Sequence, residues 1–517
     1  MKFDVSKASP EARLFFLCAI AYAAIVLFVI SRPLIWLLGY VADDAFYYLQ
    51  VARHLAESGR STFDGVNPTN GYHPGWMLIL TVAAKLVPTR ILLLRAMLLI
   101  TLIIHALGAG IMKKILERYL RPMLALVIAA GWLFNPFALR LALCGTEGPL
   151  ATCMALLAVL LALRLSDTGA VSLRRCAVLG LVLGAAVLSR TDQLLLAFLV
   201  LLPLGLERLA GRFSVTGTSL KRVAVAAGCA AVVVAPWLLF SYLSVGTLQQ
   251  DSGVMKQLWL AHQDTRRSLP DGLLPMWLAP VFGGLSGSSD PLDAMGVALM
   301  GLFAAFAARS RQTWEPFRAL SLWLLAYVLT LGAIYVWRFS DLQIWHWTTS
   351  AAACWIVVCG FAALAWEAAD SRVRRWTFAA VLFYLAALPI LRAPLREPSY
   401  VWQRATFYCA PRLQRMVPEG EPIGCFNAGI PTYFSRRHLV NLDGLVNHSI
   451  VPYWKRGEVD AYLRQNGIRY IADESHAFDR MMTFCRDNPR FTQVAVISEP
   501  GRAKYLRRLW RLENAPR

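Results

Sequence analysis

Two adjacent carboxylates, Asp43 and Asp44, follow directly on the first long apolar stretch of the chain. They open a segment whose apolar residues recur at helical spacing, so an acid at this place would cap a helix. One carboxylate is enough for a cap, and two like charges side by side repel each other unless a cation or a proton relieves them. The pair therefore also suits a general base beside a metal ligand at the membrane surface.

The loop that follows, residues 61–76, is dense in polar and aromatic side chains. Its Asp-Gly, Asn-Pro and Asn-Gly pairs are turn formers, so a tight polar loop is the plain structural interpretation. The same loop offers hydrogen-bonding groups and stacking faces that suit a sugar. The residues that could bind it are Asn67, Asn70, Tyr72 and Trp76. The remaining candidate, His73, could ligate a metal or orient a carboxylate.

The segments that must position these residues are those of a membrane protein. Of the 517 residues, 57% are hydrophobic and 16% are charged, whereas soluble chains average about 45–50% and about 25%. Long apolar stretches recur from near residue 13 to near residue 391. From the length that a span needs, we expect an all-α polytopic domain over residues 1–391 with about 10–13 transmembrane helices.

The last quarter of the chain, residues 392–517, has an ordinary composition and predicts a small soluble α/β domain. Within it, residues 422–426 and 468–472 have the pattern of strands, and residues 459–466 that of a helix. The segment from Asn441 to Asn447 contains an Asp-Gly turn, for which we expect a structural role.

The charge pattern orients the chain. There are 52 basic and 32 acidic residues, a net charge of +20, and much of the excess lies in short loops such as the one around Lys113, which is typical of cytoplasmic loops. This places the Asp43 loop and the C-terminal domain outside. No nucleic-acid-binding motif accompanies the charge, so nucleic acid is not an expected partner.

The side of the membrane is ambiguous for two segments. Residues 74–112 contain two apolar runs where the charge pattern requires one crossing, and residues 176–206 are interrupted by polar residues.

The stretch from Asp43 to Trp76 resembles the first external loop of bacterial glycosyltransferases of the GT-C superfamily, which use polyprenyl-phosphate sugars. This superfamily includes protein mannosyltransferases, aminoarabinose transferases and arabinofuranosyltransferases. The resemblance rests on the Asp-Asp pair, on residues 63–74 (FDGVNPTNGYHP) and, more loosely, on residues 427–447. It implies a multi-helix membrane domain with an acidic pair that activates the acceptor hydroxyl. We favour Asp43 as the base, with the neighbouring acid holding a metal or the surroundings of the donor phosphate.

Three further residues gain a meaning from the resemblance. Glu147 either caps the helix that starts near Pro149 or is a second catalytic acid. Arg190 either binds the donor phosphate, since a charge within an apolar run is costly, or forms a structural ion pair with Asp192, or lies in a cytoplasmic turn. Arg338 either anchors the chain at the external membrane interface or binds the phosphate.

Taken together, these observations predict an inverting glycosyltransferase of the bacterial inner membrane, with its active site facing outside. The sugar moves from a polyprenyl-phosphate donor to a hydroxyl of an envelope glycan, lipid or protein, among membrane lipids. The candidate cofactor is a divalent cation, Mg²⁺ or Mn²⁺, held by Asp44, Glu147 and His73. The alternative is a flippase for lipid-linked sugars, without transferase activity.

The segment 245–292, with His262 and Asp264, is a candidate external lid over the donor, although its aromatic residues also fit interface anchors.

Overall fold

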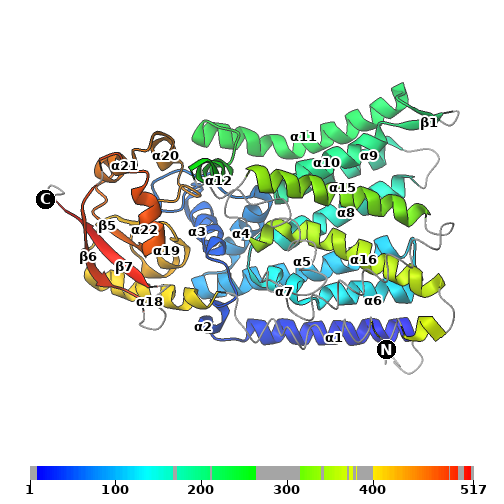
Figure 1. The fold of residues 1–517 in the computed structure, drawn as a ribbon, viewed down its shortest axis with the longest axis horizontal. Helices are drawn as coiled ribbons and strands as arrows, with labels where there is room; N and C mark the ends of the chain where they lie inside the picture. Colours follow the sequence, from blue (N-terminus) through cyan, green and yellow to red (C-terminus); the bar gives the residue numbers. More distant parts are fainter. Residues whose placement is uncertain are drawn as a thin grey trace.

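A bundle of long helices and a smaller domain of strands and helices lie end to end along the longest axis of the molecule (Figure 1). The structure is a computed structural model. It describes residues 9–166, 172–209, 212–262, 315–338, 343–368, 372–376, 380, 400–487, 489–498 and 506–513. The candidate lid residue Asp264 and the side chain of His262 lie outside this description.

The bundle is built from α-helices joined mostly by short turns. Their bounds are α1 Pro10–Ile30, α2 Leu34–Leu37, α3 Asp43–Ser58, α4 Pro74–Leu86, α5 Arg90–Leu116, α6 Pro122–Leu133, α7 Pro136–Leu143, α8 Gly148–Ser166, α9 Leu173–Ser189, α10 Gln193–Leu204, α11 Gly217–Val245, α12 Asp251–His262, α15 Glu315–Arg338 and α16 Thr348–Ala368. The 3₁₀-helix η2 (Ile344–Trp347) precedes α16, and the strands β1 (Glu207–Leu209) and β2 (Arg212–Ser214) form a hairpin between α10 and α11.

Several of these helices have the length and composition of membrane spans. Within the described ranges there are six: α1, α5, α8, α11, α15 and the continuous stretch of η2 and α16. The pair α6 and α7, bent by 50° at a break just before Pro136, would make a seventh. The chain is thus a multi-span membrane protein, and the expected fold class is confirmed. The expected total of 10–13 stays a prediction, because the apolar segments near residues 293 and 377 lie outside the described residues.

Helix α4 explains the ambiguity over residues 74–112. It has 13 residues, so it is only about 20 Å long, and both of its ends lie at the end of the bundle that carries the C-terminal domain. His73 precedes it beside Glu147, and Arg90 after it bonds to Tyr433, whose hydroxyl donates to the Arg90 carbonyl at 2.8 Å. Helix α5 alone therefore runs to the opposite end, where Lys113 pairs with Glu11 of α1 at 3.0 Å.

Residues 176–206 form two helices rather than one. Helix α9 ends at Ser189 and α10 begins at Gln193. The turn between them contains Arg190, whose guanidinium lies 2.6 Å from the carboxylate of Glu147, which is also beside His73. The turn therefore lies at the end with the C-terminal domain, opposite the end where Lys113 pairs with Glu11. The alternative of a turn on the same side as Lys113 is therefore excluded.

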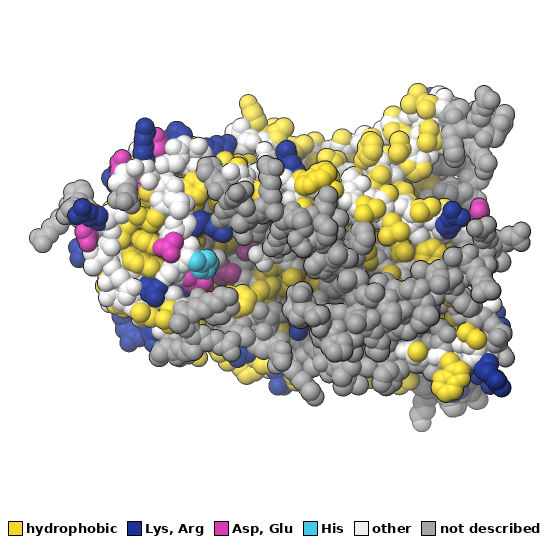
Figure 2. Space-filling model, viewed as in Figure 1, with side chains coloured by type: hydrophobic (Ala, Val, Ile, Leu, Met, Phe, Trp, Pro, Cys, Tyr) yellow, Lys and Arg dark blue, Asp and Glu magenta, His cyan; other side chains and the backbone are white. Residues whose placement is uncertain are grey.

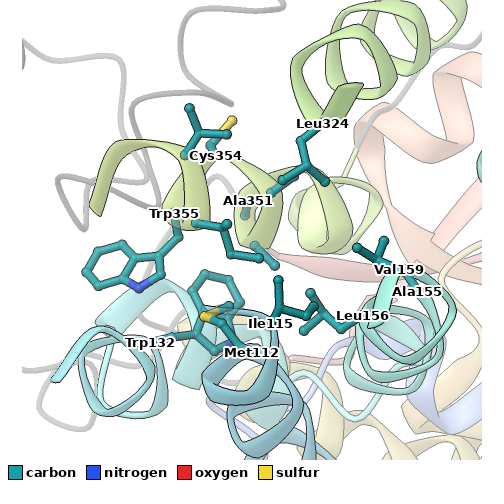
Figure 3. Packing of buried hydrophobic residues seen from close by; sticks show 14 of the residues in the cluster. Met112, Ile115, Trp132, Ala155, Leu156, Val159, Leu324, Ala351, Cys354 and Trp355 are labelled. Carbon is teal, nitrogen blue, oxygen red and sulfur yellow. The ribbon is translucent and has the colours of Figure 1, made fainter. Parts of the chain in front are cut away.

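The interior of the bundle is packed with large apolar side chains, and its outer surface is also apolar. Trp132 of α6 and Trp355 of α16 are buried next to each other, and the Trp355 indole N–H donates to the Ile128 carbonyl at 3.0 Å (Figure 3). On the outside, residues such as Leu27 and Leu243 are 71% and 74% exposed. Figure 2 shows such side chains gathered along the bundle, with Lys and Arg mainly toward the two ends of the molecule. An apolar exterior of this kind fits a bilayer.

The C-terminal domain is a mixed sheet with helices around it. Its elements are α18 Val401–Met416, β3 Ile423–Cys425, α19 Gly429–Ser435, β4 Leu439–Asn441, η3 His448–Ile450, α20 Val451–Arg456, α21 Val459–Gln465, β5 Tyr470–Glu474, α22 Ser475–Met482, β6 Phe491–Val496 and β7 Arg507–Leu512. The strand order is β4-β3-β5-β7-β6, in which β4, β3 and β5 are parallel and the other pairings are antiparallel. The predicted strands and helix correspond to β3, β5 and α21. The predicted boundary at residue 391 falls among residues that the structure does not describe.

Candidate active site

The two neighbouring acids occupy the first turn of α3, at the junction between the bundle and the C-terminal domain. Asp43 turns toward that domain, where its carboxylate accepts the backbone N–H groups of Gly429 at 3.0 Å and Ile430 at 2.9 Å. These N–H groups begin α19 and have no partner within that helix, so Asp43 caps a helix distant in sequence. Burial raises the pKa of Asp43, although the charge of Arg507 and the two N–H groups act to lower it.

Asp44 faces a cavity instead. This catalytic cavity, as we call it, has a volume of about 60 Å³ and is lined by Asp44, Tyr48, His73, Glu147 and Lys256, among others. No described residue donates a hydrogen bond to the Asp44 carboxylate. Removal from water raises its pKa to about 6, and the charges of Asp43 and Glu147 act in the same direction, against that of Lys256. At neutral pH it is an ionised acid open to the cavity, which is the state that a general base requires.

Glu147 precedes α8 on another wall of the cavity, and its carboxylate is held from several sides. One oxygen lies 2.6 Å from the Arg190 guanidinium and 3.6 Å from the His73 ring, and the other accepts the Tyr48 hydroxyl at 3.0 Å. The side chain is buried. Glu147 is therefore a carboxylate whose position is fixed by Arg190 and Tyr48.

Arg190 lies behind Glu147. It pairs with Asp192 as well as Glu147, and it donates to the Tyr335 hydroxyl at 2.7 Å and the Trp345 carbonyl at 3.2 Å. The ion pair between Arg190 and Asp192, one of the alternatives from the sequence, is thus present, and Glu147 is a second acid bound to the same guanidinium. These contacts engage the guanidinium and make Arg190 a residue that positions Glu147.

His73 lies between α3 and α4 at the wall of the catalytic cavity. Its backbone N–H donates to the Tyr48 hydroxyl at 3.1 Å. Burial lowers its pKa to about 4, with the charge of Glu147 acting to raise it and that of Arg190 to lower it, so the ring is neutral at pH 7. Its Nδ1 atom and the hydroxyl of Thr146 are buried without a partner in the described part of the chain. Both residues line the catalytic cavity, where these atoms are available to a ligand.

A lysine that the sequence analysis did not single out supplies positive charge. Lys256 of α12 lines the catalytic cavity, and its ammonium group lies 3.0 Å from His346 Nε2. Ser252, Lys256 and Trp259 recur at intervals of four and three residues, so helical periodicity would have placed them on one face of a helix. That periodicity is the signal that could have identified Lys256.

A second, larger cavity adjoins the first and extends to the C-terminal domain. This domain cavity has a volume of about 220 Å³ and shares Asp44, Tyr47, Lys256 and Leu445 with the catalytic cavity. The C-terminal domain also contributes Asn427, Asp443, His476 and Arg480. The first three of these follow β3, β4 and β5, so they lie at the carboxyl edge of the parallel strands, where α/β sheets commonly bind ligands.

Two groups in the domain cavity are set for hydrogen bonding. Asp443 accepts the Leu445 N–H at 2.7 Å and the Tyr47 hydroxyl at 3.1 Å, and burial raises its pKa to about 8 despite these bonds. Trp259 is buried, and its indole N–H has no partner among the described residues. The segment from Asn441 to Asn447, for which we expected a structural turn, therefore also lines the candidate site.

Of the four candidate sugar-binding residues, Tyr72 lines the site, whereas Asn67, Asn70 and Trp76 form hydrogen bonds within the protein. Tyr72 lines the catalytic cavity and packs its ring 5.3 Å from that of Trp237. Asn70 donates to Ser241 at 2.7 Å, and Asn67 donates to Asp64 at 2.6 Å. The buried Trp76 donates to the Gly145 carbonyl at 3.2 Å. A sugar-binding role for these last three stays a prediction that the geometry does not favour.

Arg338 lies apart from the site. It is exposed at the C-terminal end of α15 and is not among the described residues that line either cavity. Lys256, which lines both cavities, is the described cation that the geometry places nearest to both.

Within the described ranges, the expected metal ligands Asp44, Glu147 and His73 are not grouped as a metal site. Among the described residues, no three His, Cys, Asp or Glu side chains lie close enough to share a metal ion. The two oxygens of Glu147 are engaged by Arg190 and Tyr48. The requirement for a divalent cation stays a prediction, and no step of the chemistry is assigned to one.

Comparison with known proteins agrees with this architecture. Two solved structures of ArnT from Cupriavidus metallidurans, one bound to undecaprenyl phosphate and one in the apo state, are similar to the chain with a TM-score of 0.59 each. Their sequence identities are 12% and 13%, and each comparison covers 95% of this chain and 97% of ArnT. The apo oligosaccharyltransferase of Archaeoglobus fulgidus is similar with a TM-score of 0.47 and 11% identity, over 93% of this chain and 72% of that one.

At the level of sequence, the matches are narrower. A family described as a domain of unknown function (DUF8728) matches residues 399–512, which form the C-terminal domain. No curated protein matches the chain. The similarity to ArnT at this low identity shows the fold alone, so the chain has the fold of ArnT, in agreement with the fold that the resemblance of the first loop implied.

Proposed function

We propose that the protein is a membrane glycosyltransferase that takes its sugar from a polyprenyl-phosphate donor and transfers it to a hydroxyl group. The observation that carries the proposal is Asp44. It is an acid with a raised pKa and no hydrogen-bond donor among the described residues, and it faces two adjoining polar cavities. A GT-C fold surrounds it, and one ArnT structure of that fold holds undecaprenyl phosphate.

The proposed reaction is a single displacement that inverts the anomeric carbon. The acceptor hydroxyl gives its proton to the Asp44 carboxylate as its oxygen forms a bond to the anomeric carbon. The bond from that carbon to the donor phosphate breaks, and its electron pair leaves on the phosphate oxygen. Because polyprenyl phosphate is a good leaving group, no covalent enzyme intermediate is needed.

Lys256 is the residue that we assign to the leaving phosphate. It lies in the wall common to both cavities, and its charge acts on Asp44. A preorganised cation beside the position where negative charge develops stabilises the transition state more than the ground state. Glu147, held by Arg190, keeps Tyr48 in position around the reacting groups.

The domain cavity is the proposed place for the sugar or its acceptor. It combines the indole of Trp259 with the polar side chains of Asn427 and Asp443, which is the mixture of a stacking face and hydrogen-bonding groups that suits a sugar. The C-terminal domain would then be one wall of the active site. We place this end of the molecule outside the cytoplasmic membrane of a bacterium, because the basic loop at Lys113 lies at the opposite end.

A flippase is not favoured by this arrangement. Transport would need polar residues along a path through the bundle. The described polar groups of both cavities gather instead at one end of the bundle, next to the C-terminal domain.

The test uses purified protein in nanodiscs with a panel of radiolabelled polyprenyl-phosphate sugars and envelope lipids as acceptors. We expect Asp44→Asn to lower kcat at least about 10²-fold, because general-base catalysis contributes about 10²–10⁴-fold. Asp43→Asn keeps an oxygen that accepts an N–H group of α19, so it should retain most of the turnover. Equal turnover by Asp44→Asn and the wild-type protein would remove the catalytic assignment.

A further inference from the structure

A third cavity lies on a different face of α3 from the active site. It has a volume of about 500 Å³, and none of its described lining residues lines the catalytic or the domain cavity. We call it the arginine cavity. Its wall includes Gln50 and His54 of α3, Arg90 at the start of α5, and Thr432, Arg436 and Arg437 of the C-terminal domain.

The charges around this cavity are unbalanced. The charges of Arg53 and Arg436 both repel that of Arg90, and Arg53 has its own partner in Glu57 at 2.7 Å. The one acid in the described lining is Asp64, whose two carboxylate oxygens accept bonds from the backbone and side-chain amides of its own loop. Arginines crowded around a hollow in this way favour an anion between them.

The cavity wall also contains buried polar atoms that lack partners. In the described part of the chain no group bonds to Gln50 Oε1, Thr432 Oγ1, Arg437 Nε or His438 Nε2. Gln50 is 7% exposed and Thr432 is 5% exposed, so neither side chain is simply solvated. Buried polar groups are nearly always hydrogen-bonded in native proteins. Four exceptions among the residues of one cavity indicate that a ligand supplies the partners.

The groups without partners indicate which chemical groups a ligand of this cavity would carry. His54 Nδ1 lies 2.7 Å from the Thr62 carbonyl, which can only accept, so Nδ1 donates to it, and Gln50 Nε2 donates to His54 Nε2 at 3.3 Å. Gln50 Oε1 is thereby left as an acceptor and needs a donor such as a hydroxyl. The guanidinium groups of Arg90 and Arg437 each donate to a backbone carbonyl, of Tyr433 and Gln414, which does not balance their charge. An anion would balance it, and arginine binds phosphate through paired hydrogen bonds.

We propose that the arginine cavity binds a phosphate ester that also carries free hydroxyl groups, such as a glycerol-phosphate or sugar-phosphate headgroup. Arg90 is the first residue of a membrane span, so the cavity lies at the level where lipid headgroups are found, although a free phosphate ester has the same chemistry. The proposal does not depend on the glycosyltransferase assignment, because the two sites share no described residue.

Arg436 offers a direct way to test the proposal. It is exposed and is the one described residue other than glycine with a positive φ, 56°, at the end of α19. Arg436→Gly therefore removes the cation while easing the backbone, and Thr432→Val removes the unpartnered hydroxyl at nearly constant volume. Arg436→Lys keeps the charge. Arg456→Ala, which removes a cation elsewhere in the same domain, is the matched control.

Two binding experiments distinguish the sources of the ester. Glycerol 3-phosphate is titrated by calorimetry into the detergent-solubilised full chain, and phosphatidylglycerol retention is measured by native mass spectrometry after reconstitution with phosphatidylcholine. We expect Arg436→Gly/Thr432→Val to weaken binding about tenfold or more, with Arg436→Lys weakened less and with Arg456→Ala and Asp44→Asn unchanged. Ethyl phosphate, which lacks a free hydroxyl on its carbon chain, should bind more weakly than glycerol 3-phosphate.

Each outcome of these experiments has a distinct meaning. Retention of phosphatidylglycerol alone supports the proposal and identifies a lipid headgroup, and binding of both probes supports it and identifies a site open to free esters. If the wild-type protein binds neither probe better than the double variant does, while circular dichroism shows both proteins folded, the proposal is overturned. Because Asp44→Asn is included, a failure of the proposed transferase function is distinguishable from a failure of this binding site.

Discussion

Asp43 and Asp44 are neighbours in the chain, but the fold gives them different environments. The carboxylate of Asp43 caps α19 with two hydrogen bonds, whereas that of Asp44 faces a cavity that also contains Lys256. Our proposal therefore gives Asp43 a structural role and Asp44 a chemical one, as happens with paired carboxylates whose environments differ. The geometry favours Asp44 as the base, the reverse of our preference from the sequence.

The raised pKa of Asp44 predicts a pH dependence. A general base acts only when ionised, and the pKa of this carboxyl is raised to about 6. We therefore expect kcat/KM to be constant near neutral pH and to fall about tenfold per pH unit below about pH 6, as the carboxylate takes up a proton. The measurement is a pH profile of sugar transfer. A profile that stays flat well below the pKa, with the protein still folded, would contradict the assignment.

Lys256 is the second residue whose role can be tested alone. Replacement by Met keeps most of the apolar stem but removes the charge, so we expect kcat to fall about 10²-fold, as it does when one transition-state hydrogen-bond donor is lost. Lys256→Arg should recover part of the rate. Lys455→Met, in the last turn of α20, is the control for a lost lysine outside the site. Turnover by Lys256→Met at the wild-type rate would exclude a role for this charge.

The location of the site was more predictable from the sequence than the roles within it. Asp44, Glu147, His73 and Tyr72 all line the catalytic cavity, and each lies where an apolar segment meets a polar one. Local pattern could not separate them from loop residues that bind their own surroundings, as Trp76 does. Lys256 and the strand-end residues of the C-terminal domain were not chosen. Periodicity places Lys256 on one face of a helix, but only the folded chain brings that helix and the strand ends to one cavity.

At the scale of elements, the contact between α3 and α19 leaves no space for a side chain at Gly429. A methyl group there would lie 2.3 Å from the Asp43 carbonyl oxygen. We expect Gly429→Ala to lower the free energy of unfolding by about 1–3 kcal/mol, since overpacking forces the backbone to shift, and to reduce activity because Asp44 follows Asp43. Thermal unfolding and sugar transfer are both measured.

A helical glycine in open space provides the comparison for that substitution. At Gly228 of α11 a methyl group would meet no heavy atom within 4 Å, so Gly228→Ala should be neutral or stabilising. If Gly429→Ala is as stable and active as Gly228→Ala, the close approach of α3 and α19 does not hold the site together.

The turn between α9 and α10 is held by charges that are removed from water. Arg190 bonds to both Glu147 and Asp192, and it is only 3% exposed. Arg190→Met should lower the free energy of unfolding by about 3–5 kcal/mol, because it leaves buried carboxylates without their cation. Adding Glu147→Gln to Arg190→Met should recover part of that loss, which a double-mutant cycle on thermal stability measures. A cycle with no coupling between the two substitutions would show that the pair does not stabilise the turn.

Over the whole molecule, the bundle and the C-terminal domain share one apolar core. The buried cluster around α3 and α5 continues into Cys409, Ile423 and Tyr433 of the C-terminal domain, and the rings of Phe46 and Tyr433 lie 5.5 Å apart. Two parts that were predicted as separate domains therefore pack as one body near the site. The sequence could not show this, because the apolar face of α3 has the same residue pattern whether it packs against a membrane helix or against a soluble domain.

A shared core predicts shared stability. Backbone contacts also join the two parts, since the His448 N–H donates to the Pro68 carbonyl at 3.1 Å and a methyl group at Gly71 would lie 1.6 Å from the Leu445 carbonyl oxygen. We expect the amides of α3 and β3 to exchange with solvent at the same opening free energy, measured by hydrogen exchange in nanodiscs, because elements of one cooperative unit open together. Gly71→Ala should weaken protection in both elements alike. The contrary result would be that β3 exchanges at an opening free energy well below that of α3 while α3 stays protected. The C-terminal domain would then open by itself, and the domain cavity would be an entrance to the active site rather than a fixed wall of it.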